Sequence, residues 1–540
     1  MIIRKKPARP HGLHEPLRHE NHPRPVTRRQ LLGAGFLSGP AVVLAPAWLG
    51  ALLKSPTAQA QTLDPTILSF EKECLIQDAG SSGVAPPLAF ITIDLAGGAN
   101  LIGSEALVGV SGGQMNFLSA AGYSRLGLPG SMVPSSSANI DTSMGLAFHV
   151  DSAILRGIKT KATAATLAAV NGVVIPAMSQ NDTGNNPLNA MYGIAAAAAG
   201  PTGTNTQYGS LLTLCGTQST VSGGNSASPA TYINPQLQPT KIAQASDDTG
   251  LVSTSGSAPG PDTLAALASQ ARISTGSAAQ GSAPDPFLGS AVDTTLVQGN
   301  TTADAALKDQ YRCAFAKTTF TATKFGSPSA LNPLLDTNIV AASGGIFTSG
   351  EYSADSDLQA TGAVMKLVLN GYAGAGTITL GGYDYHDSTR STGETRNQHA
   401  GVVIGAILDY ARRVGRAVMI QVISDGSLNS TGMIDSSVAG RGKLGWQGDS
   451  QQTAASLILA YSPKGKPTML SQQIGFMNAD GTVNATSSPA ANANNLLVQT
   501  VMLNWMAANG TIANFDAIFP MQGLGPASAR VPYVAFNQIT

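Results

Sequence analysis

Residues 88–95 have the sequence Leu88-Ala89-Phe90-Ile91-Thr92-Ile93-Asp94-Leu95, and this apolar run stops at Ala96-Gly97-Gly98-Ala99-Asn100. Its length, its isoleucine content and the Gly-Gly stop predict a buried strand followed by a loop. Because Asp94 stands almost at the end of the run, a carboxylate is expected near the carboxyl end of this strand. The rest of the chain can be interpreted outward from this strand.

The same kind of pattern recurs along the chain. Helical spacing over 152–161 leads to the apolar run Val173-Val174-Ile175, so strand, helix and strand follow one another. A second regular region covers 358–506, in which 364–369 is compatible with either a helix or a strand. There we expect strands at 377–380, 417–423 and 454–461, and helices at 399–414 and 490–508. This alternation predicts an α/β fold with a mainly parallel sheet.

The stretch from 200 to 349 differs in composition and is rich in Gly, Ser, Thr, Ala and Pro. We interpret it as a loop-rich insertion or cap on one face of the sheet, with short helices at 262–273 and 302–315. The remaining length suits one large α/β domain or two smaller ones. We interpret 61–540 as a single domain that contains this insertion.

The N-terminal segment has the features of a twin-arginine export leader. Arg28 and Arg29 precede a moderately apolar run at 31–53, and Ala58-Gln59-Ala60 provides a small-x-small cleavage site after Ala60. Glycine and proline in the run disfavour a membrane-spanning helix, and an uncleaved anchor is the alternative. We therefore interpret residues 1–60 as a signal peptide. On this interpretation, the twin-arginine translocase is a partner of the chain during export. The expected destination is the periplasm, with the cell surface or the extracellular space as alternatives.

The charge and the cysteine content of the chain bear on nucleic-acid binding and on cysteine-based metal sites. The leader holds nine of the 31 Lys and Arg and two of the 31 Asp and Glu, so 61–540 carries 22 basic and 29 acidic residues, a formal net charge of −7. A mildly acidic chain without basic clusters gives no support for nucleic-acid binding. Cys74, Cys215 and Cys313 are too far apart in the sequence to have the spacing of a metal cluster. One disulfide together with one free thiol is compatible with the three cysteines.

Aspartates stand at or just past the ends of three expected strands, namely Asp94, Asp384 and Asp425. In an open α/β sheet, ligand sites form outside the carboxyl ends of the strands, and carboxylates gathered there need a cation to offset their repulsion. Asp384 and His386 are two residues apart on extended chain and can share one metal. The alternative is that Asp94 and Asp425 cap the segments that follow and that His386 is a loop residue.

Three further positions are candidates for chemistry. Ser179 follows the second apolar run in a loop dense in hydroxyl and amide groups, where it could act as a nucleophile, although such residues also form ordinary Asx turns. His149 precedes a helix and is expected to be a capping or core-edge residue. His399 could reach the same site as His386, with a solvated helix end as the alternative. Gly97-Gly98 does not complete a dinucleotide fingerprint, and no Walker-type Lys-Ser/Thr follows a glycine loop. No G-x-S-x-G elbow stands between an expected strand and an expected helix.

The order of these motifs resembles a large bacterial family of exported proteins in the alkaline phosphatase and sulfatase-like superfamily, often labelled sulfatase-like or general secretion pathway proteins. The resemblance is carried by the twin-arginine leader, by Leu95-Ala96-Gly97-Gly98-Ala99-Asn100, by Gly382-Tyr383-Asp384-Tyr385-His386 and by Ser424-Asp425-Gly426. It covers most of the chain after the leader and is weakest over 200–349. It implies a three-layer sandwich with helices on both faces of the sheet.

The chain departs from the family pattern at several elements. Asn100 stands where the family has an aspartate, and Ser424-Asp425-Gly426-Ser427 replaces a Ser-Glu-Phe-Gly-Arg element. An Asp-His pair is reduced to Gly448-Asp449-Ser450, and a Ser-His-Phe element becomes Ser179-Gln180-Asn181. Two expected histidines and an arginine are thereby missing.

Two functions from different classes follow from the resemblance. The first is a periplasmic, metal-dependent phosphate- or sulfate-ester hydrolase, with Asp94, Asp384, His386 and Asp425 as ligands of one divalent ion, zinc or manganese, and Ser179 as nucleophile. The second is a non-catalytic cell-envelope or secretion-associated scaffold that keeps the fold and has a degenerate metal centre. Bound metal is the observation that separates the two.

Overall fold

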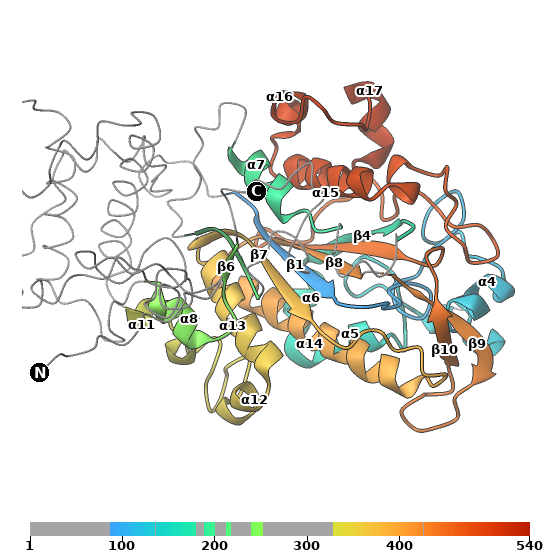
Figure 1. Ribbon diagram of the computed structural model, residues 1–540, viewed down its shortest axis with the longest axis horizontal. Coiled ribbons are helices and arrows are strands. Elements are labelled where there is room, and N and C mark those ends of the chain that lie inside the picture. Colours follow the sequence, from blue (N-terminus) through green and yellow to red (C-terminus); the bar gives the residue numbers. More distant parts are fainter. Residues whose placement is uncertain are drawn as a thin grey trace, which may run out of the picture. The chain divides into compact units, whose positions relative to one another are not determined.

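A computed structural model describes the chain from residue 87 to residue 540 with several gaps (Figure 1). All described residues belong to the compact unit Thr57–Thr540. The described ranges are 87–135, 137–179, 188–199, 212–217, 239–251, 328–424 and 426–540. The expected leader, Cys74, Cys313 and the helices expected at 262–273 and 302–315 lie outside these ranges.

A seven-stranded sheet forms the centre of the fold, in the order β4-β11-β8-β1-β7-β5-β6. Six of its strands run in the same direction, and β11 is antiparallel to its neighbours β4 and β8. The strands are β1 (Ala89–Leu95), β4 (Val170–Pro176), β5 (Leu212–Gly216), β6 (Thr240–Lys241), β7 (Ala373–Leu380), β8 (Val418–Ser424) and β11 (Ala455–Tyr461). The prediction of an α/β fold with a mainly parallel sheet is confirmed.

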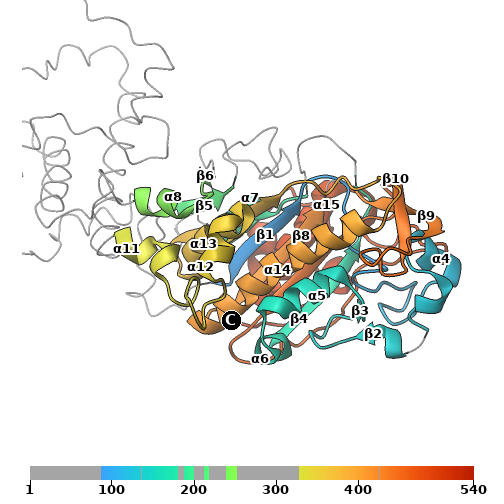
Figure 2. The same cartoon turned by 90° about the horizontal axis from the view of Figure 1, so that it is seen from below.

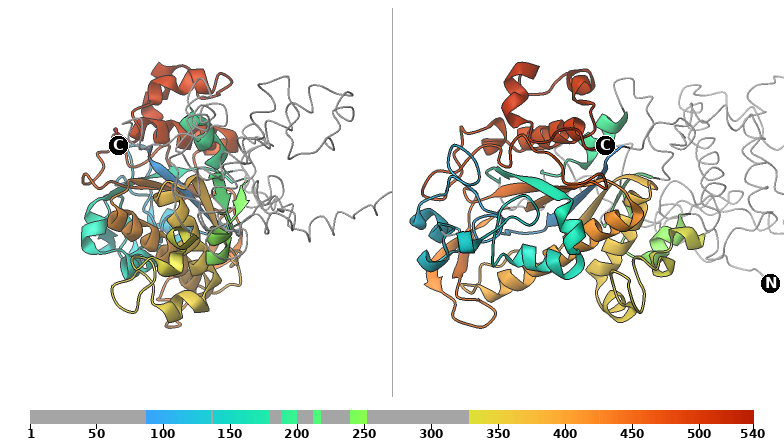
Figure 3. Two further views of the ribbon diagram at one scale, coloured as in Figure 1. Left: turned by 90° about the vertical axis from the view of Figure 1, so that its left-hand side faces the viewer. Right: turned by 180° about the vertical axis from the view of Figure 1, so that it is seen from behind.

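Helices cover both faces of this sheet (Figures 1 and 2). One face carries α5 (Ala153–Lys161), α6 (Ala164–Ala168), α13 (Ser356–Leu369) and α14 (Ser391–Val414). The other carries α7 (Met191–Ala199), α15 (Asn494–Ala508), α16 (Phe515–Ile518) and α17 (Ala527–Arg530), as Figure 3 shows. None of the helices in the described part of the chain combines the length and hydropathy that crossing a membrane requires.

Side chains of β1 alternate between the two layers, because successive residues of a strand point to opposite faces. Ile91 and Ile93 belong to the apolar cluster that includes α13 and α14. Phe90 belongs to the cluster that includes α7 and α15. With a helical layer on either side, every residue of β1 is buried, which explains why its sequence is almost continuously apolar.

Short elements complete the described part of the chain. Two two-stranded sheets are formed by β2 (Ile140–Asp141) with β3 (Phe148–His149) and by β9 (Leu428–Ile434) with β10 (Leu444–Asp449). The short helices are α4 (Ala120–Arg125), α8 (Ala245–Gly250), α11 (Pro328–Leu331) and α12 (Ser349–Ala354). In Figure 1 the β9–β10 hairpin stands at the end of the sheet toward which β1 runs.

Several expected elements differ from the observed ones in their bounds or role. Residues 364–369 are helical as part of α13, and α14 begins at Ser391 rather than at 399. The first turns of α14 are polar, and the structure buries Glu394 and Asn397 there among charged and amide partners. Within 200–349, β5 and β6 extend the central sheet itself, so this stretch is more than a cap.

Glycine allows α5 and α14 to pack at close range. A Cβ on Gly157 of α5 would overlap the carbonyl oxygen of Gln398, and it would lie 2.8 Å from the Cα of Gly401 on α14. A Cβ on Gly401 would in turn overlap the carbonyl oxygen of Ile154. This approach brings the amino-terminal ends of both helices, with their charged side chains, to the same end of the sheet.

A row of polar side chains crosses the centre of the sheet on the face of α7. Thr92 of β1 lies directly between Thr377 of β7 and Gln421 of β8 in the strand register. Asn189, which precedes α7, accepts a hydrogen bond from the Thr92 hydroxyl (3.0 Å) and donates one to the Thr377 hydroxyl (3.0 Å). The row therefore fixes the start of α7 on the sheet, because buried polar groups are stable only when they are hydrogen-bonded.

We expect Gln421→Met to lower the free energy of unfolding by about 1–3 kcal/mol, the cost of leaving buried backbone groups unpaired. The Gln421 amide donates to the Leu188 carbonyl (2.9 Å) and accepts from the Ala190 N–H (3.2 Å). The exposed Gln452→Met is the matched control, and it should change stability by less than about 0.5 kcal/mol. Denaturant unfolding of both variants is the measurement, and equal stability would contradict the role of the polar row.

Candidate functional site

The carboxyl ends of β1, β7 and β8 are level with one another. Leu95 of β1 lies opposite Leu380 of β7 and Ser424 of β8 in the parallel register. The segments that leave these three strands therefore start side by side at one edge of the sheet, which is the edge where ligands bind in open α/β folds.

The loop after β1 makes direct backbone contact with the loop after β7. The N–H of Tyr383 donates to the carbonyl of Ala96 (3.2 Å). Gly97 has a φ of +116°, and a Cβ there would lie only 2.6 Å from the backbone nitrogen of Asp384. Any other residue at Gly97 would thus be strained and would displace Asp384.

Two side chains hold the loop after β1 in place. Ser424, the last residue of β8, accepts a hydrogen bond from the N–H of Ala99 (2.7 Å) and donates one to the carbonyl of Gly97. Tyr385 accepts from the N–H of Asn100 (2.9 Å) through its phenol oxygen. The loops after β1, β7 and β8 consequently form one hydrogen-bonded unit at the edge of the sheet.

The β9–β10 hairpin joins this unit through its second strand. The N–H of Ser388 donates to the carbonyl of Trp446 (2.9 Å), and the N–H of Trp446 donates to the carbonyl of Thr389 (3.0 Å). These bonds connect β10 to the segment that follows His386. At the end of β10, Asp449 comes so close to Gly98 that a Cβ there would lie 3.4 Å from its Oδ1.

Asp384, His386 and Asp449 form a group in which one potential ligand atom from each lies within 4.8 Å of the others. The Nε2 of His386 is 2.9 Å from Oδ1 of Asp384, and these side chains are 42% and 63% exposed, respectively. Two carboxylates and an imidazole are a donor set that suits a divalent cation. The structure thus brings Asp384 and His386 together as expected and adds Asp449, which the sequence singled out only through the resemblance.

Asp94 is buried in the centre of the sheet and is not part of this group. Its Oδ2 accepts a hydrogen bond of 3.4 Å from the hydroxyl of Thr379, its register partner on β7. Asp425 directly follows β8 and lies outside the described residues. Its proposed role as a ligand stays a prediction, as does that of Asp94.

Ser179 lies at the same edge of the sheet as the group, after a different strand. It follows β4, and the sheet order puts β11, β8 and β1 between β4 and β7. Ser179 is buried, and its N–H donates to the carbonyl of Gln451 (3.3 Å). Gln451 is two residues after Asp449 in the chain, and the role of Ser179 as a nucleophile stays a prediction.

A second group of potential ligands involves His399. Its Nε2 is 3.1 Å from Asp357 and its Nδ1 is 3.8 Å from Asp355, so the ring lies between two carboxylates at the start of α13. The hydrogen bond with Asp357 raises the pKa of His399 above its ordinary value. His399 is therefore held between these two carboxylates within the helical layer and does not join the group of His386.

His149 is a buried structural residue, as expected. Its Nδ1 accepts a hydrogen bond from the N–H of Asp151 (3.1 Å), so its Nε2 donates to the carbonyl of Met132 (2.9 Å). Burial, together with the charge of Lys443, lowers the pKa of His149 to about 4. A neutral imidazole with both nitrogens used in this way has no remaining position for a metal.

A buried network of charges lies behind the candidate site. Glu394, which is 3% exposed, accepts hydrogen bonds from Arg390 (2.9 Å), Lys443 (2.8 Å) and Arg156 (2.7 Å). Arg390 also packs over the Trp446 ring, with its guanidinium carbon 4.5 Å from the ring centroid. Glu394 and Arg156 lie on α14 and α5, Arg390 directly precedes α14, and Lys443 directly precedes β10. The network therefore joins the hairpin to the helical layer.

The pKa values of the two buried glutamates here, Glu394 and Glu105, are shifted in opposite directions. Burial alone would raise the pKa of Glu394, but Arg390 and Lys443 outweigh it and lower the pKa to about 2. Burial dominates at Glu105, where it raises the pKa despite the attraction of Lys443. Glu105 is held by the hydroxyl of Ser152, the N–H of Ile154 and the amide of Asn397. It thereby ties the segment after β1 to the starts of α5 and α14.

Comparison of the chain with family models, with curated proteins and with solved structures found no match. The function is therefore inferred from the residues and their geometry. Asp449 and the charged network had no sequence signal of their own, because both depend on contacts between segments far apart in the chain. The one feature of the sequence that relates to the network is the presence of two charged residues, Arg390 and Glu394, shortly before the apolar part of the helix.

We expect Glu394→Gln to lower the free energy of unfolding by about 3–5 kcal/mol, because it leaves buried cations without their carboxylate. The folded-state pKa of Glu394 lies below the unfolded value near 4.5, so its contribution is complete above that pH and is lost as pH falls toward 2. The difference between wild type and variant should shrink in this window. Urea unfolding at a series of pH values measures it.

The control for this experiment is Glu351→Gln. Glu351 pairs with Lys161 on the surface and is 35% exposed, so its loss should cost no more than about 1 kcal/mol. Its place in the helix cap of α12 also tolerates glutamine. A loss at Glu394 no larger than that at Glu351 would show that the buried network does not stabilise the fold.

Proposed function

We propose that this protein is an exported, divalent-metal-binding member of the alkaline phosphatase and sulfatase-like superfamily that hydrolyses phosphate or sulfate esters. The observation that carries the proposal is the group of Asp384, His386 and Asp449 at the carboxyl edge of a mainly parallel sheet. Helices on both faces of that sheet are consistent with the three-layer sandwich of the superfamily. The leader with Arg28 and Arg29 supports export by the twin-arginine route.

The donor set fits a single divalent ion of borderline character, zinc or manganese. Asp384 and Asp449 would contribute carboxylate oxygens and His386 an imidazole nitrogen, and all three side chains are accessible at the surface. When bound, such an ion supplies Lewis-acid stabilisation to a phosphoryl or sulfuryl oxygen. The protein's own part is to hold these ligands in place, through Gly97 beside Asp384 and through the bonds between Trp446 and the segment after His386.

The second candidate is a non-catalytic cell-envelope or secretion-associated scaffold that keeps the fold. The observation that favours it is the loss of two histidines of the family pattern, where this chain has Gln180 and Ser450. Asn100, in the place of a family aspartate, removes another carboxylate and is buried. On this alternative, Asp384 and His386 only shape the loop after β7, and cell-envelope components are the expected partners.

Metal content tests the proposal. Purified protein should contain about one equivalent of divalent metal, and Asp384→Ala, His386→Ala and Asp449→Ala should each remove most of it, because a site with three protein ligands tolerates the loss of none. Hydrolysis of aryl phosphate or sulfate esters should fall in parallel in the same variants. Elemental analysis and an ester-hydrolysis assay are the measurements.

His399→Ala is the matched control for the metal experiment, because it removes a histidine from the other acidic group, that of Asp355 and Asp357. It should leave the metal content unchanged. Metal that persists in His386→Ala but disappears in His399→Ala would refute the assignment. Stoichiometric metal without esterase activity would favour the scaffold, and a metal-free wild type with unchanged stability in EDTA would exclude the metal-dependent hydrolase.

Export is tested separately. Replacing Arg28 and Arg29 together by Lys should trap the precursor in the cytoplasm, because the translocase recognises the arginine pair itself. Cell fractionation followed by immunoblotting measures the distribution, and a pair of substitutions at Arg4 and Arg9 in the same leader provides the control. Normal periplasmic accumulation of the Arg28/Arg29 variant would eliminate the twin-arginine route.

A further inference from the structure

Buried and exposed side chains alternate along the segment Gly382-Tyr383-Asp384-Tyr385-His386. Tyr383 and Tyr385 are 0% and 2% exposed. The side chains of Asp384 and His386, in contrast, are 63% and 42% exposed. Because neighbouring side chains of an extended chain point to opposite sides, the two potential metal ligands share one side of the segment and the two tyrosines share the other.

Both phenol hydroxyls are hydrogen-bonded to the first two turns of α14. Tyr383 donates to the carbonyl of Arg396 (2.7 Å), and Tyr385 donates to Oδ1 of Asn397 (2.9 Å). Burial raises the pKa of both phenols above the ordinary value, so both hydroxyls keep the proton that these bonds require. The residues on either side of Asp384 therefore attach the segment to the helix.

The bond between Tyr385 and Asn397 continues into the loop after β1. The Asn397 amide donates to the carbonyl of Asn100 (3.1 Å) and to Oε1 of Glu105 (2.9 Å). The phenol oxygen of Tyr385 also accepts from the N–H of Asn100 (2.9 Å). A buried hydroxyl that donates to one element and accepts from another has one favoured position, because moving it would leave buried groups unpaired.

Packing adds a steric constraint to these hydrogen bonds. A Cβ on Gly393 of α14 would lie 2.8 Å from Cε2 of Tyr385, so the ring lies directly against the helix backbone. The rings of Tyr383 and Tyr385 are neighbours, with centroids 6.3 Å apart. Close packing of this kind leaves little room for another rotamer. The buried side of the segment is thus fixed by two rings and their hydroxyls.

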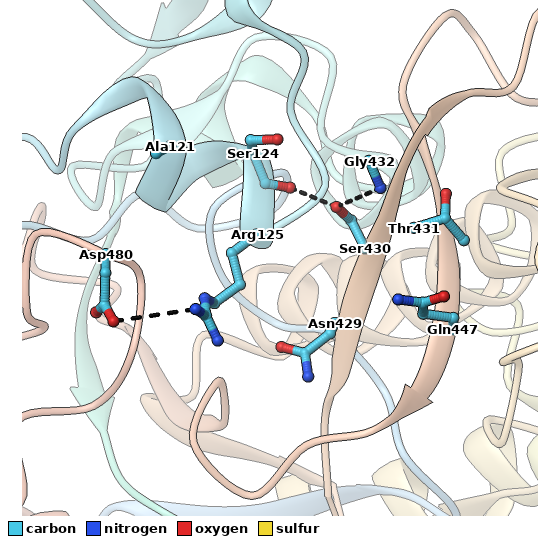
Figure 4. Close-up of a pocket in the computed structure, with 9 residues that line it drawn as sticks. All are labelled: Ala121, Ser124, Arg125, Asn429, Ser430, Thr431, Gly432, Gln447 and Asp480. Atoms are coloured by element: carbon cyan, nitrogen blue, oxygen red, sulfur yellow. Dashed lines mark hydrogen bonds and ion pairs between the residues drawn. The ribbon is translucent and has the colours of Figure 1, made fainter.

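Asp449, the third potential ligand, is positioned by other contacts. It ends β10, and the partner strand β9 is bound to α4. The hydroxyl of Ser430 on β9 donates to the carbonyl of Ser124 (2.6 Å) and accepts from the N–H of Gly432 (3.2 Å), as Figure 4 shows. Neither tyrosine takes part in these bonds. Loss of a phenol hydroxyl should therefore disturb two of the three potential ligands and leave Asp449 in place.

We propose that Tyr383 and Tyr385 are positioning residues of the candidate metal site, which hold Asp384 and His386 together by fixing their segment to α14. This inference rests on the proposed function, because it takes the group of Asp384, His386 and Asp449 as a metal site. Replacement of a tyrosine by phenylalanine keeps the ring and removes only the hydroxyl. It thereby separates the effect of the hydrogen bonds from that of filling the core.

Titration of the full-length protein with Co²⁺ after removal of metal by EDTA tests the proposal. Tyr385→Phe should bind Co²⁺ about tenfold more weakly than wild type, the loss typical of residues that support metal ligands. The visible absorption spectrum of the bound ion should change as well, because it depends on the arrangement of the ligands. Tyr383→Phe loses one hydrogen bond where Tyr385→Phe loses two, so its affinity should fall by a smaller factor.

Tyr352→Phe is the matched control. Tyr352 lies on α12 and is also 2% exposed, and its hydroxyl donates to the carbonyl of Gln359 (3.1 Å). Its ring packs against Gly362 of α13 much as the Tyr385 ring packs against Gly393. The control thus removes a buried phenol hydroxyl in a similar setting. It should bind Co²⁺ with the affinity and the spectrum of wild type, even where it lowers thermal stability as much as Tyr385→Phe does.

Hydrogen exchange of the metal-free protein separates this inference from the proposed function. Peptides that contain Asn100 or 382–386 should exchange faster in Tyr385→Phe than in wild type or Tyr352→Phe, because the Asn100 N–H has lost its acceptor. A wild type that binds no Co²⁺ would refute the proposed metal site, and exchange alone would then decide whether the tyrosine holds the segment.

The positioning role is overturned if Tyr385→Phe binds Co²⁺ as tightly as Tyr352→Phe does, or if these peptides exchange at the wild-type rate. Should Tyr385→Phe fail to fold, Tyr383→Phe decides by the same two measurements. Weaker binding and faster exchange in the tyrosine variants of the segment, with a control that behaves as wild type, is the result expected.

Discussion

The buried carboxylate of Glu394 and the three cations that donate to it are the interaction on which the edge of this molecule depends. Arg390 and Lys443 are almost fully buried with it, and each would be strongly unfavourable there without a partner. Because Lys443 lies just before β10 and Arg390 just before α14, their burial fixes the hairpin against the helical layer. The position of Asp449 at the end of β10 follows from this contact.

Backbone contacts between loops, more than contacts of the ligand side chains themselves, position the candidate metal group. Gly97 lets the loops after β1 and β7 touch, Ser424 ties the first loop to β8, and the bonds of Trp446 align β10 with the segment after His386. The three potential ligand side chains are exposed at the end of this hydrogen-bonded assembly. A bound cation would offset the repulsion of the two carboxylates, which the backbone arrangement holds close together.

The sequence was most informative where burial is decided locally. The run at 88–95 predicted β1. The apolar spacing over 399–414 predicted the second half of α14. The first half of α14 escaped prediction because its polar side chains are buried through partners on α5 and β10 rather than through hydrophobicity. For the same reason, the polar β9–β10 hairpin carried no recognisable strand pattern.

The sequence alone determined the α/β class, the parallel direction of the main strands and the pairing of Asp384 with His386, since these rest on alternation and on spacing of two residues along one strand end. The tertiary structure alone decided that Asp449 joins them and that Glu394 is buried among Arg390, Lys443 and Arg156. Those contacts join segments far apart in the chain, and their polar residues acquire a role only once folding has supplied partners that water would otherwise replace.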